Sequence, residues 1–273
     1  MLPLLPFLDD GFRDISLSQD FCEGQNAVFI KQPLSNGLCP STPDRDPTFS
    51  GTFSLDNGAY LLSLTPKNSA LTALFEQVMP LINKDFEGAP ADYSIPLGAS
   101  RLVTRALNRP VPDEGKDPLW IAIDGLFPLP MRTAHDFTEA RLTAVRKGGG
   151  VTFEYRRRMN SVTDGTSKTL MVIEDAGRPQ TWKFGVRDPQ REPNFGSAWC
   201  DPSSGIILDG PDKPLEGLVQ GSNRCGLYSF HSRGVNVGFA DGHVSTIAED
   251  IDPGVLVSLL TPDGRDNKAD SEP

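Results

Sequence analysis

The spacing of apolar residues divides this chain into short helices and strands that are separated by long polar stretches. From Ser69 to Lys84 apolar residues recur every three or four positions, which predicts a helix with one buried face. A second short helix is predicted from Asp136 to Arg146. Runs rich in β-branched and aromatic residues predict strands at 119–124, 151–155 and 169–174. Between 175 and 225 the density of Pro, Gly, Asp and Asn predicts long loops.

The clearest local pattern lies near the C-terminus, where apolar residues alternate from 235 to 247 around Asp241-Gly242. This dipeptide tolerates the positive φ angles of a tight turn, so the segment predicts a hairpin closed by a two-residue turn. In that register Phe239 pairs with Val244, which places an apolar stripe on one face of the sheet.

A short helix is predicted directly after the hairpin. Asp252 is suited to cap its first turn, Pro253 to occupy it, and apolar residues continue to Leu260. From Pro262 onward the chain is polar. We therefore predict one α+β domain over residues 1–261, with an antiparallel sheet, a few short helices and long loops, followed by a flexible tail at 262–273.

Composition narrows the classes of function. With 26 basic and 36 acidic residues the formal net charge is −10, which argues against nucleic acid as a partner. The one dense basic run, Arg156 to Arg158, is interpreted as a solvated strand edge. The sequence contains no stretch of about 20 apolar residues, the length that a membrane-spanning helix needs.

The four cysteines form two local pairs along the sequence, Cys22 with Cys39 and Cys200 with Cys225, and none belongs to a C-x-x-C motif. Zinc ribbons and redox motifs use closer pairs. An even number of cysteines in loop-rich segments is compatible with disulfides, while four buried thiols are the alternative.

Histidine and carboxylate residues offer the candidate chemistry. His231 precedes the predicted hairpin, and we interpret it as a clasp that donates to a backbone carbonyl or a carboxylate, with a metal or ligand contact as the alternative. Asp241 is interpreted as a turn former and His243 as an exposed residue on the sheet face opposite Phe239. A catalytic zinc site made of His135, His231 and His243 with Asp241 is disfavoured, because no pair has the i, i+4 spacing of a helical motif.

Other site types have weaker signals. Asp164 and Gly165 lie in an oxygen-rich turn that could hold calcium, but a helix cap or Asx turn is the preferred interpretation. Trp120, Trp182 and Trp199 would suit a carbohydrate or peptide groove, although buried tryptophan is commoner. Nucleophile-elbow, phosphate-loop and dinucleotide glycine patterns are absent from the sequence, so we predict no catalytic activity and no cofactor.

Several sequence blocks carry a family resemblance. These blocks are His231-Ser-Arg-Gly-Val-Asn-Val-Gly-Phe-Ala-Asp241-Gly242, Ser161-Val-Thr-Asp-Gly-Thr-Ser-Lys-Thr-Leu-Met-Val-Ile-Glu174, Leu4-Leu-Pro-Phe-Leu8, Leu38-Cys-Pro-Ser41 and Asp250-Ile-Asp-Pro-Gly-Val-Leu256. Together they resemble prepilin-type proteins with a C-terminal His-x9-Asp-Gly motif, a paralogous group of planctomycete bacteria described mainly as a domain of unknown function.

The resemblance implies the extracytoplasmic globular head of a pilin- or pseudopilin-like protein, with a pilin-like sheet and a structural or secretion-associated role. Its partners would be other pilin-like or secretion components, and a membrane would be contacted only through an N-terminal helix that these residues do not include. An oxidising compartment makes the disulfides Cys22–Cys39 and Cys200–Cys225 the expected pairing. An extracytoplasmic module that binds carbohydrate, peptide or calcium is the alternative function, and a metal-dependent hydrolase is the third.

Overall fold

The computed structural model has a mixed α+β fold. It describes residue 16 and residues 22–43, 45–53, 84–109, 111, 121–126, 159–194, 196–201 and 204–263. The strands are β1 (Phe49–Phe53), β2 (Lys84–Gly88), β3 (Tyr93–Ser94), β4 (Pro96–Ser100), β5 (Ile121–Asp124), β6 (Leu170–Glu174), β7 (Trp182–Lys183), β8 (Val186–Arg187), β9 (Ile206–Leu208), β10 (Val235–Phe239) and β11 (Val244–Ile247). The helices are α2 (Asn26–Phe29), α5 (Arg101–Ala106) and α7 (Pro253–Leu260), with 3-10 turns η3 (Ser35–Gly37), η4 (Met159–Ser161), η5 (Thr166–Lys168) and η6 (Pro189–Arg191).

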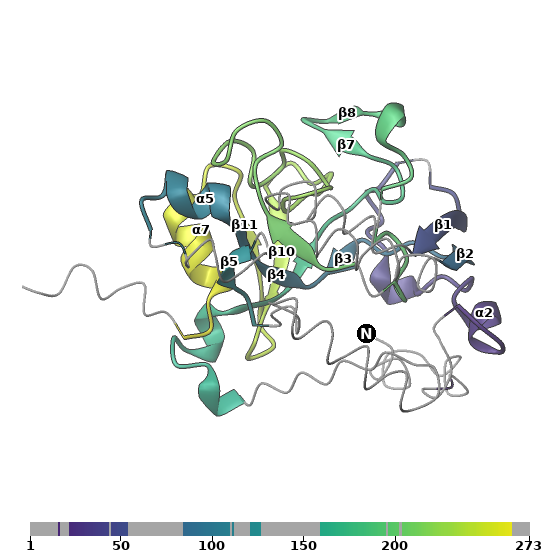
Figure 1. Cartoon of the computed structure of the whole chain (residues 1–273), viewed down its shortest axis with the longest axis horizontal. Coiled ribbons are helices and arrows are strands. Elements are labelled where there is room, and N and C mark those ends of the chain that lie inside the picture. Colours follow the sequence, from purple (N-terminus) through teal and green to yellow (C-terminus); the bar gives the residue numbers. More distant parts are fainter. Residues whose placement is uncertain are drawn as a thin grey trace, which may run out of the picture.

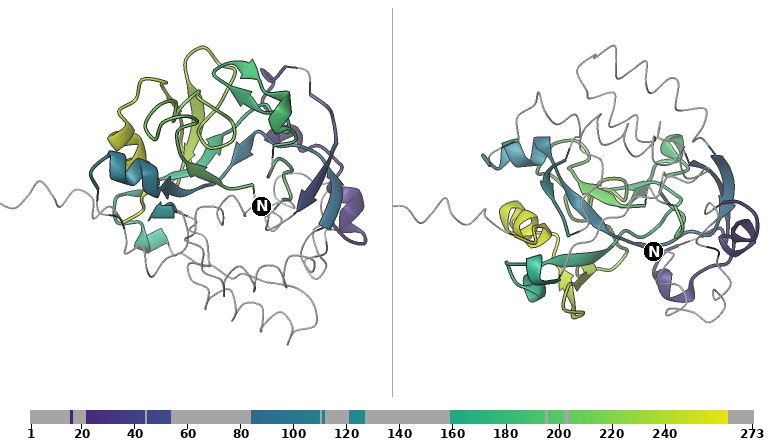
Figure 2. Two further views of the ribbon diagram at one scale, coloured as in Figure 1. Left: turned by 45° about the horizontal axis from the view of Figure 1, so that its top comes forward. Right: turned by 60° about the horizontal axis from the view of Figure 1, so that its bottom comes forward.

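The strands form several small sheets. A four-stranded antiparallel sheet has the order β11-β10-β6-β3, and a three-stranded sheet has the order β5-β4-β9, in which β4 and β9 run parallel. Helices α5 and α7 lie together at one end of the molecule, while β1, β2 and α2 lie at the other end (Figures 1 and 2). The sheet built on β6 and β10 therefore lies between these two ends of the molecule.

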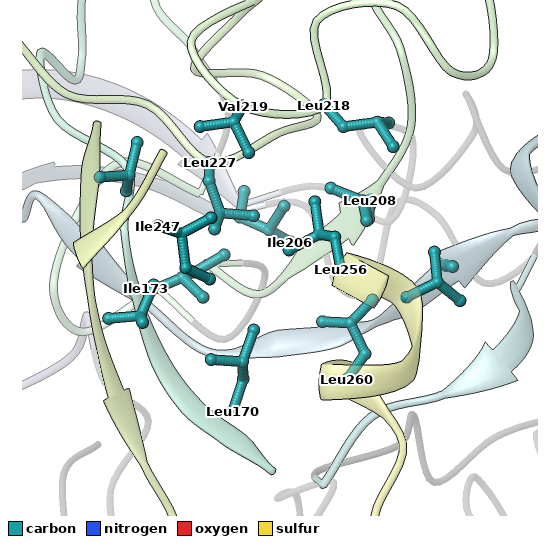
Figure 3. Close-up of a cluster of buried hydrophobic side chains, with 14 of the residues drawn as sticks. Leu170, Ile173, Ile206, Leu208, Leu218, Val219, Leu227, Ile247, Leu256 and Leu260 are labelled. Carbon is teal, nitrogen blue, oxygen red and sulfur yellow. The ribbon is translucent and has the colours of Figure 1, made fainter. Parts of the chain in front are cut away.

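The main core forms where α7 covers the sheets. Asp252 caps this helix by accepting a hydrogen bond from the Val255 amide at 3.0 Å, as predicted. Leu256 and Leu260 on its inner face are fully buried beside strand residues such as Leu208 (Figure 3). A second apolar cluster lies at the opposite end and includes Ile30, Leu34, Phe86, Ala198 and Trp199.

The C-terminal hairpin is present, but its register differs by one residue from the prediction. Gly238 lies opposite Val244, and the Phe239 amide donates to the His243 carbonyl at 2.9 Å, so residues 240–242 form a three-residue loop. The predicted pairing of Phe239 with Val244 is therefore wrong. Because a shift of one residue reverses the face, Phe239 is buried whereas Val244 is 72% exposed.

Other predicted elements are only partly described. The strands predicted at 119–124 and 169–174 correspond to β5 and β6. The residues at 69–83, 136–146, 151–158 and 264–273 lie outside the described part of the chain. Lys84, predicted as the end of a helix, instead begins β2. Within the described residues, no helix combines the length and apolarity required to cross a bilayer.

The predicted disulfides Cys22–Cys39 and Cys200–Cys225 are not present, because none of these four cysteines forms a disulfide in the described structure. The fold separates the cysteines that are close in sequence. Cys39 lies next to His231, with 3.4 Å between Sγ and Nε2, whereas Cys22 packs against the apolar cluster that contains Cys200. Cys225 lies elsewhere, where its carbonyl accepts a hydrogen bond from the Asp209 amide at 2.7 Å.

Substitutions at two glycines of the hairpin region are expected to lower the free energy of unfolding by different amounts. Gly234 and Gly242 both have positive φ angles, 122° and 91°. A Cβ atom on Gly234 would lie 2.1 Å from the Ile247 carbonyl oxygen, whereas a Cβ on Gly242 would meet no atom within 4 Å. We expect Gly242→Ala to lower the free energy of unfolding by about 1–2 kcal/mol through backbone strain, and Gly234→Ala to lower it further by pushing β10 from β11. Urea unfolding of both variants tests this; equal costs would contradict it.

Candidate functional site

His231 is held in place by a compact turn. The Ser229 hydroxyl donates to the Gly234 carbonyl at 2.8 Å and accepts a hydrogen bond from the His231 amide at 3.1 Å. The Gln220 side chain donates to the His231 carbonyl at 3.2 Å. These bonds hold the backbone from which the imidazole projects.

The imidazole of His231 contacts two other segments of the chain. Its Nε2 atom lies 3.1 Å from Oε1 of Glu174 and 3.4 Å from Sγ of Cys39. Its Nδ1 atom lies 3.3 Å from the hydroxyl oxygen of Ser41. The side chain is 32% exposed, so one edge of the ring faces solvent. We call the three residues Cys39, Glu174 and His231 the junction.

Glu174 is the buried centre of the junction. It ends β6, pairs with Tyr93 of β3, and its side chain has no exposed surface. Oε2 accepts a hydrogen bond from the Asn236 amide at 3.0 Å. Oε1 accepts no hydrogen bond of acceptable geometry from the described residues, although His231 Nε2 is close. A buried carboxylate oxygen without a well-aligned donor is costly, which makes this atom notable.

A second buried carboxylate, Asp92, positions the segment that carries Cys39. Its Oδ2 accepts hydrogen bonds from the Cys39 amide at 2.6 Å and the Thr42 hydroxyl at 3.2 Å, and it forms an ion pair with Arg45. Its Oδ1 accepts a hydrogen bond from the Gly177 amide at 2.9 Å. Asp92 therefore fixes the N-terminal loop against the chain that follows β6.

Asp175, the residue after Glu174, is also buried. It forms an ion pair with Arg178, whose guanidinium donates to the carbonyls of Gly196 and Asn223 at 2.9 and 3.3 Å. Burial raises the pKa of Asp175 to about 8 despite the opposing effect of Arg178. Three acidic side chains thus lie in a region with little access to water.

These buried carboxylates affect the pKa values of two neighbouring weak acids, the Cys39 thiol and the Tyr93 phenol. Burial, and next the interaction of the thiol with the Glu174 carboxylate by hydrogen bonding and by charge, raise the pKa of Cys39 to about 11. Burial and the charge of Glu174 likewise raise the pKa of Tyr93 to about 12. The junction therefore disfavours additional negative charge unless a cation accompanies it.

The junction lacks the arrangement of a cysteine nucleophile with a histidine base. In such triads the acid contacts the ring nitrogen opposite the one that faces the nucleophile. Here Cys39 and Glu174 both face Nε2, and Ser41 faces Nδ1. A raised thiol pKa also opposes formation of the reactive thiolate. The three groups converge on one point instead, with their ligand atoms all within 4.8 Å of one another.

His231 and His243, two members of the zinc site that the sequence disfavours, do not share a cluster of possible metal ligands in the described structure. His243 lies in the hairpin loop region, where Nδ1 is 2.6 Å from Oδ1 of Asp241, and its ring stacks on Phe239 with the centroids 4.2 Å apart. His243 is exposed, but on the same face as Phe239 rather than the opposite one. Asp241 Oδ1 also accepts a hydrogen bond from the His243 amide at 3.1 Å. His231 belongs to the separate junction, and His135 lies outside the described residues.

The turn at Asp164 and Gly165 supports a local structural interaction. The Asp164 amide donates to the Pro262 carbonyl at 3.3 Å, and its side chain accepts a hydrogen bond from the Thr261 hydroxyl at 3.4 Å. The Gly165 carbonyl accepts a hydrogen bond from the Lys168 amide at 2.9 Å. These bonds connect the start of β6 to the end of α7. Calcium binding at this turn stays a prediction.

The two tryptophans in the described residues do not share a groove. Trp199 is buried in the second apolar cluster, and its Nε1 donates to the Gln32 carbonyl at 3.0 Å. Trp182 packs edge-to-face on Phe230, with 5.0 Å between ring centroids. Trp120 lies outside the described residues. A surface hollow that shares Phe86 with the second cluster is lined by Ser50, Gly51, Asp85, Phe86, Glu87 and Pro193.

Sequence reasoning selected His231 but missed its partners. Glu174 was recognised only as the end of a strand, Cys39 only as half of a disulfide, and Asp92 not at all. A signal was available, because Cys39, Glu174 and His231 each lie in a block that carried the family resemblance. Nothing in the spacing within those blocks indicated that they meet in space.

Comparison with known proteins gives a family but no activity. The family model described as "Protein of unknown function (DUF1559)", with the short name SBP_bac_10, matches residues 1–254. No curated protein and no solved structure matches the chain.

The raised pKa of Cys39 predicts slow alkylation. A shift of the thiol pKa from 9.0 to about 11 leaves roughly 100-fold less thiolate at pH 8, so iodoacetamide should modify Cys39 slowly and about tenfold faster per pH unit up to about pH 11. Glu174→Gln should accelerate the reaction by removing the adjacent charge. Peptide mass spectrometry measures this site by site, with the exposed Glu87→Gln as control. An unchanged rate in Glu174→Gln would contradict the electrostatic explanation.

Proposed function

Because the chain belongs to DUF1559, a family of proteins of unknown function, we propose its role from the resemblance of its sequence blocks and from the contacts that those blocks make. We propose that it is the non-catalytic, extracytoplasmic globular head of a pilin- or pseudopilin-like protein, with a structural or secretion-associated role. Other pilin-like or secretion components would be its partners, and an N-terminal apolar helix would attach it to the membrane. The location, the partners and the anchor rest on the resemblance of the sequence blocks.

One observation supports a structural role for the blocks that carry this resemblance. Three of them converge in space: the Leu38–Ser41 block supplies Cys39, the 161–174 block supplies Glu174, and the His-x9-Asp-Gly block supplies His231. Their side chains approach one another although the residues are far apart in the sequence; Cys39 and His231 are separated by 192 residues. Motifs that serve to hold distant segments together are expected to converge in this way, and they need no substrate to explain them.

The remaining motif residues support the same interpretation. Asp241 turns the hairpin through its bond to the His243 amide, and Asp252 caps α7. Asp164 joins the start of β6 to Thr261 at the end of α7. Each of these polar side chains therefore stabilises a turn, a helix start or a contact between elements.

Cell fractionation of the organism that makes the protein tests the proposal. The full-length natural gene product, detected by antibody, should co-purify with the cell envelope and be degraded by protease added to cells with a permeabilised outer layer. A cytoplasmic marker should survive the same treatment. Recovery of the protein in the soluble cytoplasmic fraction, protected from protease together with the marker, would contradict the extracytoplasmic role.

A further inference from the structure

The junction has the composition and spacing of a metal site. Within the described residues, Cys39, Glu174 and His231 are the group of His, Cys, Asp and Glu side chains whose ligand atoms converge. Thiolate sulfur, imidazole nitrogen and carboxylate oxygen are the donor types that Zn²⁺ uses. Ca²⁺ and Mg²⁺ prefer oxygen alone, so the sulfur and nitrogen donors select against them. We propose that Cys39, Glu174 and His231 together bind one zinc ion.

The distances between the donor atoms suit a tetrahedral ion. With zinc bonds of about 2.0–2.3 Å, a tetrahedral site separates nitrogen and oxygen ligands by roughly 3.4 Å and sulfur and nitrogen ligands by roughly 3.6 Å. The observed separations are 3.1 Å between Nε2 of His231 and Oε1 of Glu174, and 3.4 Å between Nε2 and Sγ of Cys39. These two separations differ from the tetrahedral values by a few tenths of an ångström, and the third pair, Sγ of Cys39 and Oε1 of Glu174, lies within 4.8 Å.

The orientation of the imidazole is the one that a zinc ligand requires. A coordinating histidine offers the lone pair of one ring nitrogen and donates the N–H of the other to a fixed acceptor. Ser41 Oγ lies 3.3 Å from Nδ1 and can accept that proton, which leaves Nε2 to face Glu174 and Cys39. Ser41 is thus a positioning residue for the proposed site.

Other contacts hold the Glu174 carboxylate and the backbone of Cys39 in place without using the atoms that would bind the ion. Oε2 of Glu174 is occupied by the Asn236 amide, and the Cys39 amide is held by Asp92. The buried Oε1 atom, by contrast, accepts no well-aligned hydrogen bond from the described residues. A cation bonded to Oε1 would give this atom the well-aligned partner that the nearby side chains of His231 and Cys39 do not supply.

Charge favours the same ion. A thiolate and a carboxylate supply two negative charges beside a neutral imidazole, and one Zn²⁺ balances them, which offsets the cost of burying them. Because His231 is 32% exposed and Ser41 is exposed, solvent can reach the ion and supply the fourth ligand.

This site goes beyond the structural role proposed above, and the two can fail separately. A junction without metal could still hold the segments through hydrogen bonds, whereas zinc binding would hold wherever the protein resides in the cell. A readout of the metal itself is therefore required.

Cobalt titration provides that readout, because Co²⁺ occupies zinc sites and absorbs light according to its ligands. The full chain, without an affinity tag, is reduced, freed of metal with a chelator and titrated with CoCl₂. We expect one equivalent to bind, with a thiolate-to-cobalt charge-transfer band in the near ultraviolet and intense tetrahedral d–d bands in the visible. Addition of ZnCl₂ should abolish both.

Matched variants locate the ion. Cys39→Ser should lose the charge-transfer band, and Glu174→Gln and His231→Asn should each weaken binding at least tenfold. Cys225→Ser and His243→Asn, which change a thiol and a histidine outside the junction, should leave the titration unchanged. Cys39→Asp keeps a ligand atom and should retain binding without the charge-transfer band, so it remains informative where Cys39→Ser fails to fold. Absence of one-equivalent binding, or equal loss in the control variants, would overturn the proposal.

Discussion

The arrangement of the described fold depends on a carboxylate that has no contact with solvent. Glu174 ends β6 in the middle of the four-stranded sheet, and each of its two oxygens faces a different part of the chain. Oε2 accepts a hydrogen bond from the Asn236 amide in β10, and the other side of the carboxylate faces His231 and Cys39. A buried charge without partners is unfavourable by several kcal/mol, so these segments must approach Glu174 for the sheet to be stable around it.

Asp92 imposes a second constraint of the same kind and explains why the N-terminal loop docks on the sheet. It precedes β3, the strand that pairs with the end of β6, and it holds the Cys39 amide on one side and the Gly177 amide on the other. The two carboxylates thus act on the same loop from different directions. Burial, and after it the nearby Glu174 carboxylate, raises the pKa of Cys39 and Tyr93, with a smaller contribution from the charge of Asp92.

Local features of the fold could be predicted from the sequence because short-range physics determines them. The capped start of α7 and the position of β6 follow from residue types within a few positions. The hairpin register was missed by one residue because Asp241-Gly242 suits both two-residue and three-residue loops. The burial of Phe239 against the exposure of Val244 distinguishes them, and that burial depends on the rest of the core.

The site could be predicted only in part, because it is made by long-range contacts. His231 was identifiable from its motif, but Cys39 lies 192 residues away and its assignment to a disulfide followed from sequence proximity to Cys22. The fold brings Cys22 to the cluster of Cys200 and Cys39 to His231 instead. Pairings of this type depend on loop paths that a single sequence does not encode in its local pattern.

A double-mutant cycle on Glu174 and His231 tests most directly whether the junction holds the fold together. The free energy of unfolding in urea is measured for the wild type, Glu174→Gln, His231→Ala and the double variant, with chelator present so that metal does not contribute. Residues that act on each other should show an interaction energy of about 1–3 kcal/mol, whereas the pair Glu174 and His243 should be additive within about 0.5 kcal/mol. Additive costs for Glu174 and His231 would contradict the central role of the junction.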